Sequence, residues 1–459
     1  MKMLVVVHWF PPLETAGTEV YTFNLAKALQ ARGNEVHVYY TQRRADRPQY
    51  EMTRGTHEGL PVFEVVHNLE YDSFRNVYKN EVMEAHLRNV LDEVRPDVVC
   101  VQHLHFHSIG YIGIIKERGI PIIYTLAEYL NICLRNGWLV NLQFELCDGP
   151  APEKCVGCTE YLPAPTEAGV PASSPEPFRN RPRYSLRRFL RKLRHRFMAS
   201  RTRAGESGGG PANPWLEAVR LRWSEIKAQL DMVDLFIAPS RFLREQFIRA
   251  GMIDRDRIIH SDYGFDHRPF RDMDRKRTHS KTLRVGFIGQ VGEQKGVDVL
   301  VEAFNGLPDD EIECQVWGSL EAFPYHVEQL KKLRRHQGVK FMGRYQNTRI
   351  AEVLGGIDVL VVPSLWYENS PLTIHEAFMA GVPVITGNQG GMAELVESGV
   401  SGLLFEIGDV LDLRRQIQRL IEEPGLLAGL RRNIPRVKTI EEDAREMEQR
   451  FHALLDAAR

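Results

Sequence analysis

The sequence predicts an α/β protein built on two doubly wound parallel sheets. Short apolar runs of strand length alternate with longer stretches in which apolar residues recur at helical spacing. This alternation occurs twice, and the polar residues 265–281 separate the two series as an interdomain connection. The length of 459 residues, with 43% apolar and 26% charged residues, suits a globular protein with more than one domain.

The first series opens with a β-α-β unit. The apolar run from Leu4 to Val7 predicts a buried strand, and a Gly-containing turn leads to apolar residues at helical spacing from Val20 to Leu29. Gly33 ends that helix. Further strands are expected at residues 36–40, 62–66, 97–101, 120–124 and 235–238, with helices near 76–94 and 108–118.

The second series has the same pattern. Its strands are expected at residues 283–288, 312–317, 339–341, 359–362, 382–385 and 402–405. The expected domains are residues 1–265, which include an insertion at about 128–214, and residues 282–436, followed by a helix at 437–459 that crosses back to the first domain. Because ligands of parallel sheets bind beyond the carboxyl ends of the strands, the cleft between the two sheets is the expected site.

Charge and hydropathy exclude several classes of protein. With 59 Lys and Arg against 60 Asp and Glu, the net charge is −1, so no nucleic-acid partner is expected. No apolar run of 18 residues occurs, and the apolar residues near Met1 form too short a run for a secretory signal. We therefore expect a cytoplasmic protein with reduced thiols.

The insertion carries a basic segment at residues 179–203. It holds eleven Lys and Arg and no Asp or Glu, and Leu186, Phe189, Leu190, Leu193 and Phe197 share one helical face. This composition is typical of a helix on an anionic membrane surface, which predicts peripheral association with the inner face of the membrane. A solvated cationic helix that packs its apolar stripe on its own domain is the alternative.

Four of the six cysteines lie within 26 residues, at Cys133, Cys147, Cys155 and Cys158. The last two have the C-x2-C spacing that lets one turn present two thiolates to a tetrahedral metal, so a structural zinc site is one hypothesis. Free thiols and a redox disulfide are the alternatives. Four thiolates leave no open metal position, so such a zinc would be structural.

Two acidic residues flank a predicted helix start in the second series. Glu368 lies in the loop before Pro371, and Glu376 lies eight positions later, inside the helix. The backbone N–H groups of Leu372 and Thr373 are unpaired at the helix start, where the helix dipole favours an anion. This order of groups can hold a sugar hydroxyl, a phosphate and a ribose.

The whole ordered set resembles the retaining GT-B glycosyltransferases of family 4. The resemblance rests on the Glu-x7-Glu spacing, the run Ala-Phe-Met-Ala-Gly-Val-Pro-Val-Ile at residues 377–385, Gly390-Gly391-Met392-Ala393-Glu394, and residues 399–405. It implies two Rossmann-like domains that face a central cleft, with the acceptor on the first domain and a nucleotide sugar on the second. It further implies a hexosyltransferase-type enzyme that moves a sugar from a UDP- or GDP-sugar to a glycan or lipid-linked acceptor, in polysaccharide or glycolipid biosynthesis and without a catalytic cofactor.

The resemblance also implies roles for single residues. Lys295 contacts the diphosphate in the Lys-Gly turn after the first strand of the second domain, and Glu368 orients the donor sugar. Gln290 stands where the family usually has Arg, so one cation is missing. Donor binding is assigned to Gly17, Gln290, Lys295, Leu372, Thr373, Glu376, Gly390 and Gly391.

The acceptor side departs from the family pattern. His103 and His105 follow a predicted strand at the cleft, where His105 is a catalytic candidate and His103 an acceptor-side candidate. Ala127 and Glu128 stand where the family commonly has His-Asp, so Glu128 is a second acceptor-side candidate. The departures at Ala127 and Gln290 keep open the alternative of a non-catalytic member that binds a nucleotide sugar. A two-domain nucleotide-sugar epimerase is the other alternative.

Overall fold

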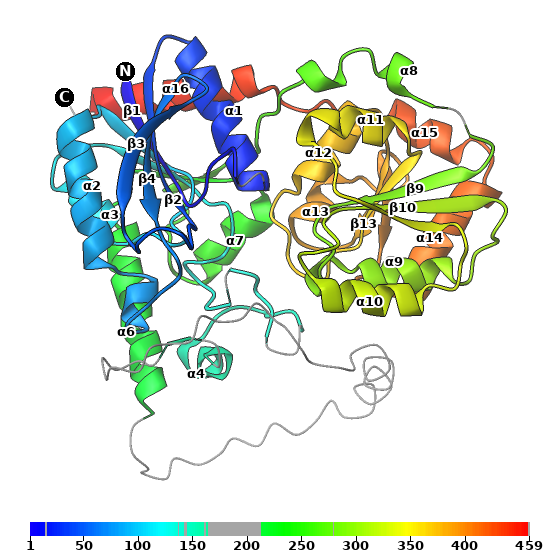
Figure 1. Cartoon of the computed structure of the whole chain (residues 1–459), viewed down its shortest axis with the longest axis horizontal. Helices are drawn as coiled ribbons and strands as arrows, with labels where there is room; N and C mark the ends of the chain where they lie inside the picture. The colour runs from blue at the N-terminus through cyan, green and yellow to red at the C-terminus, as the bar shows by residue number, and fades with distance from the viewer. Residues whose placement is uncertain are drawn as a thin grey trace.

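A computed structural model of the chain describes residues 1–13, 16–135, 137–141, 145–159, 162–163, 213–278 and 280–457. It contains an 8-stranded and a 6-stranded sheet, each flanked by helices (Figure 1). The predicted fold class is therefore confirmed. The basic segment 179–203 lies outside the described residues.

The first sheet has the strand order β3-β4-β2-β1-β5-β6-β7-β8. All its neighbours pair in parallel except β3 and β4, which form an antiparallel hairpin. The strands are β1 (Lys2–Val7), β2 (Glu35–Gln42), β3 (Met52–His57), β4 (Leu60–Val66), β5 (Val98–Val101), β6 (Ile122–Thr125), β7 (Leu235–Ala238) and β8 (Ile258–His260). The helical elements of this part are α1 (Gly17–Ala31), η1 (Arg75–Val77), α2 (Glu81–Val94), α3 (Tyr111–Lys116), α4 (Pro152–Cys155), η2 (Val156–Cys158), α6 (Pro214–Leu230) and α7 (Arg241–Arg249).

The second sheet is parallel throughout, with the order β11-β10-β9-β12-β13-β14. Its strands are β9 (Leu283–Ile288), β10 (Ile312–Trp317), β11 (Val339–Gly343), β12 (Val359–Val362), β13 (Val384–Gly387) and β14 (Gly402–Phe405). In the sequence, η3 (Arg268–Phe270) and α8 (Met273–Lys276) lie between β8 and β9. The remaining helical elements are η4 (Glu293–Lys295), α9 (Val297–Phe304), α10 (Pro324–Leu333), η5 (Asn347–Arg349), α11 (Ile350–Gly355), α12 (Leu372–Met379), α13 (Gly390–Leu395), α14 (Val410–Glu422), α15 (Leu426–Arg432) and α16 (Ile440–Ala457).

The burial of the central strands explains why apolar runs predicted them from the sequence. β1, β5 and β6 are buried along almost their whole length, because a parallel sheet covered on both faces buries both sets of alternating side chains. The sequence missed β3 and β8. β3 is mostly polar and lies at the sheet edge, and β8 has only three residues. Neither presents the apolar pattern of a central strand.

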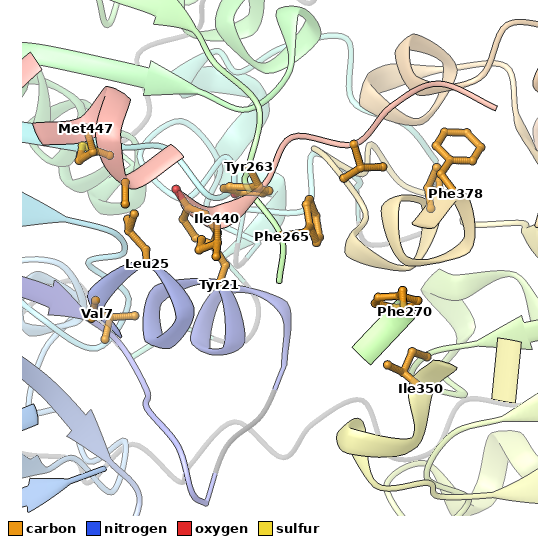
Figure 2. Packing of buried hydrophobic residues seen from close by; sticks show 14 of the residues in the cluster. Val7, Tyr21, Leu25, Tyr263, Phe265, Phe270, Ile350, Phe378, Ile440 and Met447 are labelled. Atoms are coloured by element: carbon orange, nitrogen blue, oxygen red, sulfur yellow. The ribbon is translucent and has the colours of Figure 1, made fainter. Parts of the chain in front are cut away.

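The last helix, α16, packs on α1 of the first domain. Tyr21 Oη donates a 2.8 Å hydrogen bond to Asp443 Oδ2 in this contact. Figure 2 shows Tyr21 beside Tyr263 and Ile440, with Phe265 continuing the cluster toward Phe378 of α12. One buried apolar cluster thus extends from the first domain into the second. No described helix combines the length and apolar character needed to cross a bilayer.

Candidate active site

The start of α1 and the start of α12 meet across the two domains. A Cβ placed on Gly17 would lie 3.3 Å from the Leu372 side chain, so only a small residue leaves this contact undisturbed. The contact brings the Gly-containing loop of the first domain to the amino end of α12. Two predicted donor-side residues, 355 positions apart in sequence, are therefore neighbours.

Glu368 and Lys295 form the polar centre of the site. Lys295 Nζ lies 2.5 Å from Glu368 Oε1, and the same oxygen accepts hydrogen bonds from Ser364 Oγ at 2.8 Å and Trp366 Nε1 at 2.9 Å. The ammonium also lies 5.2 Å from the centre of the Trp366 ring. Sequence reasoning paired neither Ser364 nor Trp366 with the site, although both lie within four residues of Glu368.

The turn that carries Lys295 depends on the glycine after it. Gly296 has φ +67° and is the N-cap of α9, and a Cβ there would lie 2.0 Å from the carbonyl oxygen of Pro363. The close approach ties the Lys295 turn to the chain that leads into Glu368. Gln290, at the carboxyl end of β9, is exposed and forms no hydrogen bond within the described part of the chain.

Helix α12 presents an open amino end. Its N-cap is Pro371, which offers no side-chain cap, and the backbone N–H groups of Leu372 and Thr373 have no partner among the described residues.

Glu376 lies one turn further along α12 and is partly buried, and burial raises the pKa of its carboxyl to about 8. No described side chain bonds to it, so this carboxyl is free to meet a ligand.

Sequence reasoning also missed an aromatic pair close to Glu376. Trp317 ends β10 and Tyr345 follows β11, and their ring centres lie 6.3 Å apart in an edge-to-face arrangement. Burial raises the pKa of Tyr345 above its ordinary range, and Glu376 contributes to the same shift, which places the two side chains near each other. Partly exposed rings at the carboxyl edge of a parallel sheet offer a surface on which a planar group can stack.

Gly390 and Gly391 pack against the loop that holds Glu368. The backbone N–H of Gly391 donates a 3.0 Å hydrogen bond to the Glu368 carbonyl. A Cβ on Gly391 would lie only 1.4 Å from the Asn369 carbonyl oxygen. The contact shows why a residue without a side chain stands there, and it fixes the backbone next to Glu368.

The two candidate histidines of the first domain, His103 and His105, follow the carboxyl end of β5. His103 Nε2 lies 3.4 Å from Glu128 Oε1, so the two acceptor-side candidates are in contact. His105 stacks on Phe106 with ring centres 3.8 Å apart, and burial lowers the pKa of its imidazole to about 3. No contact joins His105 to Lys295 or Glu368 in the described residues.

No disulfide joins the four clustered cysteines in the described part of the chain, and α4 and η2, which carry Cys155 and Cys158, pack on α6. Burial, and to a smaller extent Cys147 and Cys155, raises the pKa of Cys133 to about 11. Within the described ranges, no three side chains of His, Cys, Asp or Glu are gathered as metal ligands would be. The zinc site stays a prediction.

Trp138, which lies in the sequence between Cys133 and Cys147, extends toward the Lys295–Glu368 contact. Its ring centre lies 6.2 Å from that of Trp366.

Known proteins with this architecture were found among solved structures. A Thermosynechococcus elongatus sucrose-phosphate synthase superposes with a TM-score of 0.65 over 99% of each chain, at 16% identity. The Anabaena HepE protein in complex with UDP and glucose gives 0.63 over 99% of this chain and 100% of its own, at 16% identity. The chain has the GT-B fold.

Sequence comparisons agree with the GT-B assignment. Residues 270–437 match the family model "Glycosyl transferases group 1", and residues 15–126 match "Glycosyltransferase Family 4". A sulfoquinovosyl transferase of Arabidopsis thaliana is 27% identical over 46% of this chain and 41% of its own length. A D-inositol 3-phosphate glycosyltransferase of Rhodococcus jostii is 29% identical over 44% and 48%. These matches span about half the length of the relatives or less.

Proposed function

We propose that the protein is a retaining hexosyltransferase that moves a sugar from a UDP- or GDP-sugar to a glycan or lipid-linked acceptor. The observation that carries the proposal is the Lys295–Glu368 contact in the second domain, beside the open amino end of α12. A cation next to a helix amino end suits a diphosphate, and an adjacent carboxylate suits sugar hydroxyls. The glycosyltransferase family matches to both domains support this reading.

In the proposed reaction, each group has one task. Lys295 and the N–H groups of Leu372 and Thr373 stabilise negative charge on the diphosphate as the bond to the sugar breaks. Glu376 accepts hydrogen bonds from ribose hydroxyls, and Glu368 orients the donor sugar. The acceptor oxygen attacks the sugar on the face that the diphosphate leaves, and its proton passes to the leaving phosphate oxygen. No protein nucleophile and no cofactor are required.

A screen of nucleotide sugars tests this proposal. Wild-type protein is mixed with UDP-, GDP- and ADP-sugars, and binding is followed by thermal shift and sugar release by chromatography. We expect one donor to be turned over, and Lys295→Ala to lower kcat about a hundredfold or more. Exposed Lys340, paired with Glu313 on the second sheet, gives the matched control Lys340→Ala. An inverted anomeric configuration in the product would contradict the retaining mechanism.

The departures at Ala127 and Gln290 favour one competing function, a non-catalytic protein that binds a nucleotide sugar. Tight donor binding without turnover of any donor identifies that case. Conversion of a nucleotide sugar into its epimer without an acceptor identifies an epimerase instead.

The proposal places the acceptor at the inner face of an anionic membrane, through the basic segment 179–203. Sedimentation with vesicles of neutral or anionic lipids tests this part. We expect binding to the anionic vesicles alone, and its loss at high salt. Equal binding to neutral vesicles, or none to either, rules out an electrostatic membrane contact.

A further inference from the structure

A surface cavity of about 350 Å³ lies at the amino edge of the second sheet. Its walls are the end of the interdomain connection, the first residues of β9, the residue before β12, and α15 (Figure 1). Ligands of parallel sheets bind beyond the carboxyl ends of the strands, where Lys295 follows β9 and Glu368 follows β12. Because β9 and β12 begin at the cavity, it lies at the opposite edge and is separate from the candidate active site.

Positive charge dominates the lining of this cavity. Asp358 is the one acidic residue among the described residues that line it, and the basic ones are Arg277, Lys281, Arg284 and Arg431. Glu313, on the neighbouring strand β10, does not line the cavity and pairs with Lys340 at 2.7 Å. Four positive charges against one negative charge leave an excess of three, although the whole chain has a net charge of −1.

Asp358 holds two of the arginines in place. Its Oδ2 accepts a 2.9 Å hydrogen bond from Arg284 Nε, and its Oδ1 accepts one of 2.8 Å from Arg431 Nη2. Burial opposes ionisation of Asp358, but the hydrogen bonds from these arginines keep the pKa of its carboxyl below the ordinary value. A single carboxylate balances only one of the two guanidinium charges, so the other stays uncompensated.

Two of the basic side chains keep donors available. Arg431 bonds to the described residues through Nη2 alone, and its Nε has no partner among them. Lys281 is exposed and forms neither a hydrogen bond nor an ion pair within the described part of the chain. Arg284, by contrast, uses all three guanidinium nitrogens on Asp358 and Thr278. Arg431 and Lys281 can therefore donate to a ligand, while Arg284 contributes charge.

This set of groups suits a phosphate group. Free N–H donors on cations bind the oxygens of an anion, and the hydroxyls of Ser280 and Thr282, 2.9 Å apart on the same wall, can donate to further oxygens. The excess positive charge excludes a metal cation. A phosphate group carries a charge of about −1.5 to −2 at neutral pH, so it balances this excess better than a carboxylate does.

The size of the cavity allows a ligand larger than free phosphate. A water molecule occupies about 30 Å³ in the liquid, so the cavity holds the volume of roughly ten waters. A phosphate ion has five non-hydrogen atoms and fills only part of that space. Room therefore remains for a small organic group attached to the phosphate.

We propose that Lys281, Arg284 and Arg431 form a site for a phosphate group, carried by free phosphate or by a small phosphate ester. Lys281 and Arg431 contact the phosphate oxygens, and Arg284 adds charge and fixes Asp358. The inference goes beyond the proposed function and does not depend on it, because the site lies at the other edge of the sheet from Lys295.

Calorimetry of the full chain in phosphate-free buffer at constant ionic strength tests the site. The probes are inorganic phosphate, glycerol 3-phosphate and, as the phosphate-free control, glycerol. The variants are Lys281→Gln and Arg431→Gln. Their matched controls are Lys332→Gln on α10 and Arg432→Gln on α15, which remove the same charge from exposed residues outside the cavity. Arg431→Gln also loses a bond to Asp358, so thermal melting reports whether it is folded, and Lys281→Gln alone decides the test if it is not.

We expect the wild type to bind both phosphate probes and not glycerol. Lys281→Gln should weaken binding at least about threefold and Arg431→Gln about tenfold, whereas both controls and Lys295→Ala stay within about twofold of the wild type. Tighter binding of glycerol 3-phosphate assigns the site to a phosphate ester, and equal affinities assign it to free phosphate.

Three results would overturn the site. The first is a wild type that binds neither phosphate probe. The second is wild-type affinity in Lys281→Gln, and a loss in Lys295→Ala alone would then place the phosphate at the candidate active site instead. The third is an equal loss in the control variants, which would show attraction to surface charge in general.

Discussion

Ser240 Oγ donates a 2.8 Å hydrogen bond to Asn369 Oδ1, and this buried contact joins the two domains beside Glu368. The other end of the Asn369 amide donates to the carbonyl oxygens of Leu126 and Ala127, each at 3.2 Å. Ser240 is also the N-cap of α7. Through Asn369, the first domain therefore holds the loop that carries Glu368.

Replacing Asn369 removes all three contacts. In Asn369→Ala, the Ser240 hydroxyl and two carbonyl groups lose a buried partner, at about 1–3 kcal/mol for a group left unpaired. We expect a lower melting temperature and a kcat at least about tenfold lower, because Glu368 is no longer held by the first domain. Calorimetric melting and donor turnover measure both effects. The control Asn433→Ala removes an exposed amide at the end of α15. Unchanged turnover in Asn369→Ala would show that the contact has no part in positioning.

Gly391 offers a second test of the same loop. A Cβ in Gly391→Ala would lie 1.4 Å from the Asn369 carbonyl oxygen, so the backbone at Glu368 must move. We expect a loss of stability and of donor turnover together. Gly429→Ala is the matched control, because its Cβ on helix α15 would have nothing within 4 Å. That variant should gain about 0.4–1 kcal/mol of stability. Equal behaviour of the two variants in thermal melts contradicts the packing argument.

The raised pKa of Glu376 predicts a pH dependence of stability. Burial raises it from an ordinary 4.5 to about 8, so between these values the folded protein holds a proton that the unfolded chain has released. Stability contributed by this group therefore falls as the pH rises through that window. We expect Glu376→Gln not to lose this stability. The melting temperature of Glu376→Gln minus that of the wild type should therefore increase from pH 5 to pH 8. A constant difference across the window would exclude the raised pKa.

The thiol cluster is tested by elemental analysis of protein purified without added metal. If Cys133, Cys147, Cys155 and Cys158 bind structural zinc, we expect about one equivalent in the wild type and in the control Cys314→Ala, since Cys314 lies apart in β10. Cys155→Ser with Cys158→Ser should lose the metal and the stabilisation it gives. If the wild type holds less than about one-tenth equivalent of zinc, free thiols and a disulfide are the remaining alternatives. Thiol titration distinguishes these two.

The fold could be predicted because its signals are local. The alternation of apolar runs and helical spacing follows directly from burial of both faces of a parallel sheet, as β1 and β9 show. The spacing of Glu368 and Glu376 placed both near one helix start, since eight residues span about two turns. Short or polar elements such as β3 and β8 lack these signals.

The amino-acid sequence by itself determined the two sheets, the helix with an open amino end, and the residue types of the cleft. Only the tertiary structure decided which side chains meet. Lys295 and Glu368 are 73 positions apart, Ser240 and Asn369 are 129 apart, and Tyr21 and Asp443 are 422 apart. Periodicity reports which face of an element is buried, whereas these pairs depend on how elements far apart in the sequence pack on one another. The physical reason is that a contact between distant elements leaves no local pattern in either partner.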